Sequence, residues 1–239
     1  MPGTRRRRHS GRHRLADDQP AGGGEHAGAP VTGVAQAQAW ARTAAAAEVA
    51  GRDGEARRDY ARALAADPDD VPTRLALVRV LTRLEEPEEA LAALDEALVR
   101  RANDFDLLLA RGRMLGQLRR YADAEADLRR VIRLQPEHGP AHFELGLILV
   151  RRGRATDAAE AFARAVATGP ESADTYTELA EALNQSGRLS EAATALERAV
   201  ALDPARPRAY NLLGRVLDRL ERPQEAAAMY RRAREVAVQ

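Results

Sequence analysis

The chain has 239 residues, and because only 4% are aromatic, a buried core must consist of Leu, Ala and Val. It contains no Cys, which excludes disulfides, thiolate nucleophiles and Cys-based metal sites and favours a reducing compartment. The formal net charge is +1, and all 37 basic residues are Arg, which together with the high Ala content is typical of a GC-rich bacterial genome. No apolar run reaches the roughly 18 residues needed to cross a membrane. We therefore expect a cytoplasmic bacterial protein without a transmembrane segment.

Residues 1–34 are predicted to form a disordered tail, since they are rich in Gly, Pro, Arg and His and almost lack large apolar side chains. A basic cluster from Arg5 to Arg14 lies within it. The simpler interpretation is a solvated tail, and the alternative is attachment to nucleic acid or another anionic surface through this cluster. We do not expect nucleic-acid binding elsewhere, because Asp and Glu slightly outnumber Arg in the rest of the chain.

The predicted ordered part, residues 35–239, repeats every 34 residues. The stretches 139–172 and 173–206 align position by position. The same register defines six units, at 37–70, 71–104, 105–138, 139–172, 173–206 and 207–239. A fixed period of this length indicates a solenoid, in which each unit is one helix pair that cannot bury its apolar face alone.

Columns of matching residues run through the units and predict how the helices pack. Position 20 is always Ala: Ala56, Ala90, Ala124, Ala158, Ala192 and Ala226. Position 8 is mostly small: Ala44, Val78, Gly112, Gly146, Ala180 and Gly214. Position 24 is large: Tyr60, Leu94, Leu128, Phe162, Leu196 and Tyr230. Small residues at positions 8 and 20 allow the two helices of a pair to approach closely.

Other residues mark the helix ends. The second helix is expected to end before Pro68, Pro136, Pro170 and Pro204. Turns within the pairs are expected at Gly51–Gly54, Gly153 and Gly187. Candidate N-cap residues of the next helix are Asp69, Asn103 and Ser172.

This pattern resembles the tetratricopeptide repeat (TPR) family, whose units read Trp-x2-Leu-Gly-x2-Tyr, then Ala-x3-Phe, then Pro. The resemblance implies an all-α fold, a right-handed superhelical solenoid of six antiparallel helix-turn-helix pairs. It further implies that the first helix of each pair lines a concave groove, which binds peptide segments of other proteins.

The register of the family places the groove residues. In units two to four it predicts an apolar strip with two Arg alongside: Leu75, Leu109, Phe143, Leu147, Arg79 and Arg113. In units five and six it predicts a polar part: Glu181, Asn184, Asn211 and Arg215. Phe143 occupies none of the packing positions of the repeat, so it is either a binding hot spot or a cover for a neighbouring helix. The residues of the family's clamp for a free C-terminal carboxylate are not present together in any three units.

No catalytic constellation, phosphate-binding loop or cofactor motif is found, and we expect no metal at His138 and His142, which lack further ligands. We therefore predict a non-enzymatic scaffold or adaptor, whose groove holds an extended or helical partner segment that is apolar with some acidic residues. A second hypothesis is a homo-oligomer that assembles through the last hairpin, where Met229 and Tyr230 have no evident cover.

Overall fold

The computed structural model describes residues 33–237, and every regular element in this part of the chain is an α-helix. The predicted tail lies outside the described residues as far as residue 32, and α1 begins at Gly33. None of the helices between residues 33 and 237 has the length and apolar character that crossing a bilayer requires.

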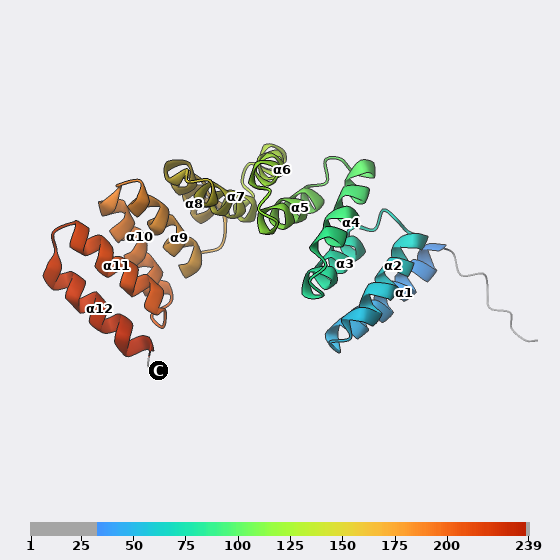
Figure 1. Ribbon diagram of the computed structural model, residues 1–239, viewed down its shortest axis with the longest axis horizontal. Coiled ribbons are helices and arrows are strands. Elements are labelled where there is room, and N and C mark those ends of the chain that lie inside the picture. The colour runs from blue at the N-terminus through green and yellow to red at the C-terminus, as the bar shows by residue number, and fades with distance from the viewer. Residues whose placement is uncertain (1–32, 238–239) are drawn as a thin grey trace, which may run out of the picture. The chain divides into compact units, whose positions relative to one another are not determined.

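Between residues 33 and 237, twelve helices follow one another as six pairs (Figure 1). The first helices of the pairs are α1 (Gly33–Val49), α3 (Val71–Arg83), α5 (Phe105–Gln117), α7 (Gly139–Arg151), α9 (Ala173–Gln185) and α11 (Pro207–Arg219). The second helices are α2 (Asp53–Ala66), α4 (Pro87–Arg100), α6 (Tyr121–Leu134), α8 (Ala155–Thr168), α10 (Leu189–Leu202) and α12 (Pro223–Ala237). Each helix contacts chiefly its neighbours in the chain, as in a solenoid. The predicted all-α solenoid of helix pairs is confirmed.

The close approach within a pair occurs where the repeat predicts it. A Cβ atom on Gly146 would lie 2.6 Å from the ring of Phe162, which is fully buried. The same two positions bring Gly112 against Leu128, where a Cβ would lie 2.9 Å from the Leu side chain. Small residues at position 8 thus make room for the large residues at position 24.

The turn between the two helices of a pair has the same backbone shape in all six units. Position 15 has a positive φ throughout, and three units fill it with Gly: Gly51 at 71°, Gly153 at 72° and Gly187 at 81°. The other three units hold larger residues there: Glu85 at 59°, Arg119 at 59° and Glu221 at 60°. The predicted turns at Gly51, Gly153 and Gly187 are confirmed, whereas Gly54 already belongs to α2, and the left-handed conformation also recurs where the sequence has no Gly.

Two of the predicted N-caps are wrong by one residue. The caps are Asp70, which accepts a hydrogen bond from the Thr73 N–H at 3.4 Å, and Asp104, which accepts from Leu107 at 3.2 Å. These carboxylates sit three residues before the N–H groups they accept from, the spacing that capping requires. Ser172 does occupy the cap position of α9, but its side chain makes no cap hydrogen bond.

The first helices lie closer together than the second helices do. Contacts join α1 to α3, α3 to α5, α5 to α7 and α9 to α11, while no two second helices of the described residues make a comparable contact. A row of elements that is tighter on one side curves toward that side. We call the tighter side the first-helix face and the opposite side the second-helix face.

Candidate protein-binding groove

A hollow of about 300 Å³ opens between α3 and α5 on the first-helix face. Its lining includes buried Leu109 and half-buried Leu75, which form part of an apolar floor. Arg79 and Arg113 are exposed and also line it. Four residues predicted from the repeat register thus meet at one hollow, which combines apolar surface with two guanidinium groups and the exposed carboxylate of Asp106.

Arg79 is tied to the preceding unit. Its Nε and Nη2 donate to the Glu48 carboxylate at 2.7 and 2.9 Å, and the same carboxylate accepts from Arg83 at 2.9 Å and from the Tyr60 hydroxyl at 2.8 Å. The hydrogen bond from Arg79 is the largest cause that lowers the pKa of Glu48 from 4.5 to about 2. Arg79 is therefore held in a fixed position at the edge of the hollow.

Arg113 is held more loosely. Only its Nε donates, to Glu144 of α7 at 2.6 Å, and its two terminal amino groups have no partner among the described residues. A guanidinium with free N–H groups can bind a carboxylate of another molecule through charge-assisted hydrogen bonds. Arg113 is thus the strongest candidate for a polar contact in this hollow.

The apolar strip continues on α7 with Phe143 and Leu147, both half-buried and packed against the core. The Phe143 ring lies 5.6 Å from the Phe162 ring, with an interplanar angle of 60°. This tilted arrangement is a favourable aromatic contact. Phe143 therefore covers α8 of its own pair while part of it remains accessible from the first-helix face.

The predicted polar part forms a second hollow, of about 550 Å³, between α9 and α11. Its polar lining consists of Glu181, Arg208, Asn211 and Arg215. Arg208 donates to Glu178 at 2.6 Å, and Arg215 to Glu181 at 3.4 Å. The side chain of Asn211 is exposed and has no partner among the described residues.

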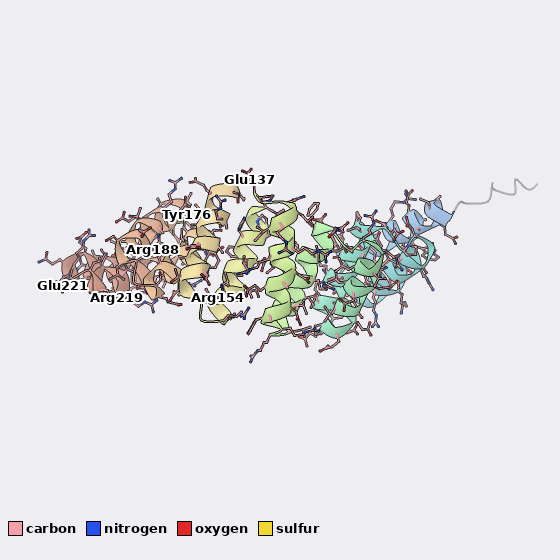
Figure 2. The ribbon with its side chains drawn as sticks, turned by 90° about the horizontal axis from the view of Figure 1, so that it is seen from above. Glu137, Arg154, Tyr176, Arg188, Arg219 and Glu221 are labelled. Atoms are coloured by element: carbon pink, nitrogen blue, oxygen red, sulfur yellow. The ribbon has the colours of Figure 1, made fainter. Side chains whose placement is uncertain are left out.

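Asn184 lies farther along the same two helices. Its backbone oxygen accepts from Arg219, labelled in Figure 2, at 2.7 Å. Most of the predicted polar residues thus link α9 to α11, while Asn211 stays free for a ligand.

These links between neighbouring first helices were not predicted from the sequence. Glu48, Glu144 and Glu178 accept from Arg residues one unit away, across 30 to 35 positions of the chain. Opposite charges at about one repeat length are the signal that would have found them, because the first helices of adjacent units contact each other.

The two histidines of unit four are engaged in local hydrogen bonds. His138 Nδ1 accepts from the Ala141 N–H at 3.1 Å and caps α7, and His142 Nε2 donates to the Pro136 oxygen at 2.7 Å. In the described part of the chain, no three His, Cys, Asp or Glu side chains gather in a way that could hold a metal ion. The pair therefore serves the start of α7.

Met229 and Tyr230 of the last hairpin are half-buried and pack against the core. The Tyr230 hydroxyl donates to Asp218 at 2.8 Å, and a Cβ on Gly214 would lie 2.6 Å from the Tyr230 ring. Tyr230 therefore closes its own helix pair, as Tyr60 does in the first unit.

Comparisons with known proteins agree with this architecture. The family model described as the C-terminal domain of cilia and flagella-associated protein 70, a TPR domain, matches residues 14–239. The solved structure of MamA from Desulfovibrio magneticus RS-1, residues 41 to the end, is similar at 27% identity and a TM-score of 0.64, covering 69% of this chain and 93% of that one.

Two further structures share the fold. PilF of Pseudomonas aeruginosa is 21% identical, with a TM-score of 0.70 over 81% of this chain and 88% of its own. The TPR protein YrrB is 21% identical, with a TM-score of 0.65 over 74% of this chain and 91% of its own. No curated protein sequence matches the chain.

Proposed function

We propose, from the premise that the chain belongs to the TPR family represented by the C-terminal domain of cilia and flagella-associated protein 70, that it is a non-enzymatic scaffold. Proteins of this architecture serve protein–protein interaction in general. In our proposal, the first-helix face holds a segment of one partner protein. The lack of Cys and the Arg-rich composition support a place in a bacterial cytoplasm.

The hollow between α3 and α5 carries the proposal. It offers buried apolar surface next to Arg113, whose terminal amino groups are free, and Arg79, which is fixed by Glu48. Apolar pockets bordered by a few oriented polar groups are the usual form of a recognition site. A segment with an aliphatic or aromatic side chain and a neighbouring Asp or Glu fits this combination. Farther along the first-helix face, Asn211 in the polar hollow would form hydrogen bonds with the same segment.

The test replaces both guanidinium groups with neutral amides, Arg79→Gln together with Arg113→Gln. Two charge-assisted contacts are removed, so the affinity for the partner should fall about tenfold or more. A matched control replaces two exposed Arg without partners on second helices, Arg58→Gln together with Arg234→Gln. The measurement is affinity capture from lysate, followed by titration of the captured protein.

A protein that wild type and the control retain, and that the groove variant loses, would support the proposal. Equal retention by all three proteins would contradict it. Phe143→Ala is a further variant. Its melting temperature must be measured together with its affinity, because the substitution also removes the contact with Phe162. The melting temperature of the groove variant has to be measured as well, because Arg79→Gln removes two hydrogen bonds to the largely buried Glu48 carboxylate.

Self-assembly through the last hairpin remains the alternative. The inward contacts of Tyr230 give it less support than the groove has. Its test is Met229→Glu, which leaves the Tyr230 hydrogen bond in place. A mass that rises with concentration in light scattering, and that this substitution returns to the monomer value, would favour assembly. The other alternative, attachment through the basic tail, rests on residues outside the described part of the chain.

A further inference from the structure

The second-helix face carries a hollow of about 400 Å³ between α6 and α8, with α7 as its floor. The floor is apolar, because Leu145, Leu149 and Ala161 are buried and Ile132 packs beside them. This hollow lies on the opposite side of the helix pairs from the groove of the first helices, so a ligand here would not compete for Arg79 or Arg113.

Two arginines that line this hollow have no partner. The guanidinium groups of Arg133 on α6 and Arg164 on α8 are exposed, and neither donates to any side chain or backbone oxygen of the described residues. Most Arg side chains among residues 33–237 are engaged in ion pairs, whereas these two are not. An Arg that keeps all its donors free beside an apolar floor is available to a ligand.

The other charges of the lining are mostly neutralised. Arg129 pairs with buried Glu125 at 2.8 Å, and Arg154, labelled in Figure 2, pairs with Glu125 and Asp157. Glu160 is the one carboxylate of the lining without an ion pair. The unpaired charge is therefore positive, with two guanidinium groups against one carboxylate.

Two other hollows on the same face differ in this respect. Between α2 and α4, Arg57 pairs with Glu89 at 2.8 Å and Arg74 with Glu96 at 3.0 Å. Between α8 and α10, Arg188 pairs with Glu191 and Arg198 with Glu171. In both, each Arg of the lining is already bound to a carboxylate of the chain, so an acidic ligand would have to displace an existing partner.

We propose that the hollow between α6 and α8 is a second docking site, which takes an acidic, aliphatic-containing segment of a partner protein. An aliphatic side chain of the segment enters the floor formed by Leu145, Leu149 and Ala161. Its Asp or Glu side chains accept from Arg133 and Arg164. The occupant is a protein segment rather than a nucleic acid, because the only ring in the lining, His142, is buried and offers bases no exposed aromatic face on which to stack.

Selection of a displayed library of random short peptides on the full chain tests this site. We expect an enriched class in which Leu, Ile or Met stands among Asp and Glu. Its affinity should fall about tenfold or more in a variant with Arg133→Glu and Arg164→Glu, and less with Gln at both positions. Its affinity should also fall as salt concentration rises.

Two controls make the outcome specific. Arg58→Glu with Arg234→Glu changes the net charge equally, and Arg79→Gln with Arg113→Gln changes only the first-helix face. Neither should alter the affinity more than about twofold, a change that corresponds to about 0.4 kcal/mol. All variants alter exposed side chains, so unchanged melting curves would verify that they fold.

The proposal would be overturned if no enriched peptide depended on Arg133 and Arg164, or if the dependent peptides lacked acids. Equal loss in the charge-matched control would also overturn it, because that would indicate a general effect of net charge. The hollow would be assigned to a different ligand if the binding of single-stranded RNA or anionic vesicles required these two arginines and the binding of peptides did not.

Discussion

Gly146 leaves no room for a side chain, because a Cβ atom there would lie 2.6 Å from the ring of Phe162. The substitution Gly146→Ala should lower the free energy of unfolding by about 1–3 kcal/mol, since a buried aromatic ring has to move. The gain in helix propensity from Gly to Ala, up to about 1 kcal/mol, offsets only part of this loss. Urea unfolding followed by circular dichroism measures the change.

Gly54→Ala is the matched control. Gly54 lies in the first turn of α2, and nothing lies within 4 Å of the position that its Cβ would take. This variant should be as stable as wild type or slightly more stable. If both substitutions changed stability equally, the close contact between Gly146 and Phe162 would not determine the effect.

The sequence predicted single residues well where the requirement is steric. The small residues at position 8 and the large ones at position 24 meet as expected, because volume can be read directly from residue type. Partners of charged residues were not predictable in the same way. Arg111 stands at a position where Leu77 and Leu145 occupy the core in neighbouring units, and it bonds to Asp127 at 2.7 Å and Asp95 at 2.8 Å. Which of several acids a long side chain reaches depends on the arrangement of three helices.

At the scale of elements, the turn between the two helices of a pair has a left-handed residue in every unit. At Glu85, Arg119 and Glu221 this conformation causes steric strain, because these residues carry a Cβ atom and Gly does not. Each substitution to Gly should raise the free energy of unfolding by about 0.5–1 kcal/mol, because relief of strain exceeds the added entropy of the unfolded chain. The triple variant Glu85→Gly, Arg119→Gly and Glu221→Gly should show a higher melting temperature in calorimetry.

The reverse substitution provides the control for this prediction. Gly153→Ala puts a side chain on a residue with φ of 72°, where nothing else lies within 4 Å of the new methyl group. Any loss of stability therefore comes from the backbone conformation alone. A triple variant that melts below wild type would show that the side chains of the three residues contribute more than the strain costs.

The second helices share a feature that was not predicted from the sequence. In five units the residue before the helix is an Arg that pairs with an acid in the first turn: Arg52 with Glu55, Arg120 with Asp123, Arg154 with Asp157, Arg188 with Glu191 and Arg222 with Glu225. The acid lies near the positive end of the helix dipole. Standard capping signals are short polar residues, so an Arg at this position was not recognised as a helix start.

At the scale of the molecule, stability arises from contacts within units and between adjacent units. Glu48 belongs to the second kind, since it links α1 to Arg79 and Arg83 of α3. Its side chain is 12% exposed. Glu48→Gln should lower the stability of the first helix pair at pH 7 by about 1–3 kcal/mol, because charge-assisted hydrogen bonds become neutral ones. Trp40, the single Trp of the chain, lies in α1 and reports on this pair by fluorescence.

This difference should depend on pH. The pKa of Glu48 is lowered from 4.5 to about 2 in the folded chain, so its carboxylate stabilises the fold fully above pH 4.5, and this contribution is lost as the pH falls toward 2. The gap in urea midpoint between wild type and Glu48→Gln should therefore shrink from pH 7 to pH 2. A gap that stayed constant over this range would show that Glu48 acts through packing and not through its charge.

The family, the repeat register and the helix pairs follow from the sequence because periodicity constrains all six units at once. The second-helix hollow between α6 and α8 does not, since its free guanidinium groups are recognised only after the partners of the other Arg side chains are known. The groove residues were predicted by position, yet the bonds of Arg79 and Arg113 to Glu48 and Glu144 emerge only when neighbouring units are placed.

All the links between units that depend on a positive charge use Arg, because the chain contains no Lys. Guanidinium groups stay protonated at any pH that the fold is expected to meet, whereas amines lose their proton near pH 10. Enzymatic acetylation and amine-reactive crosslinkers act on the Lys ε-amino group, so neither can neutralise these links. The ion pairs between neighbouring units are thus unaffected by modification of amines, both in the cell and in the laboratory.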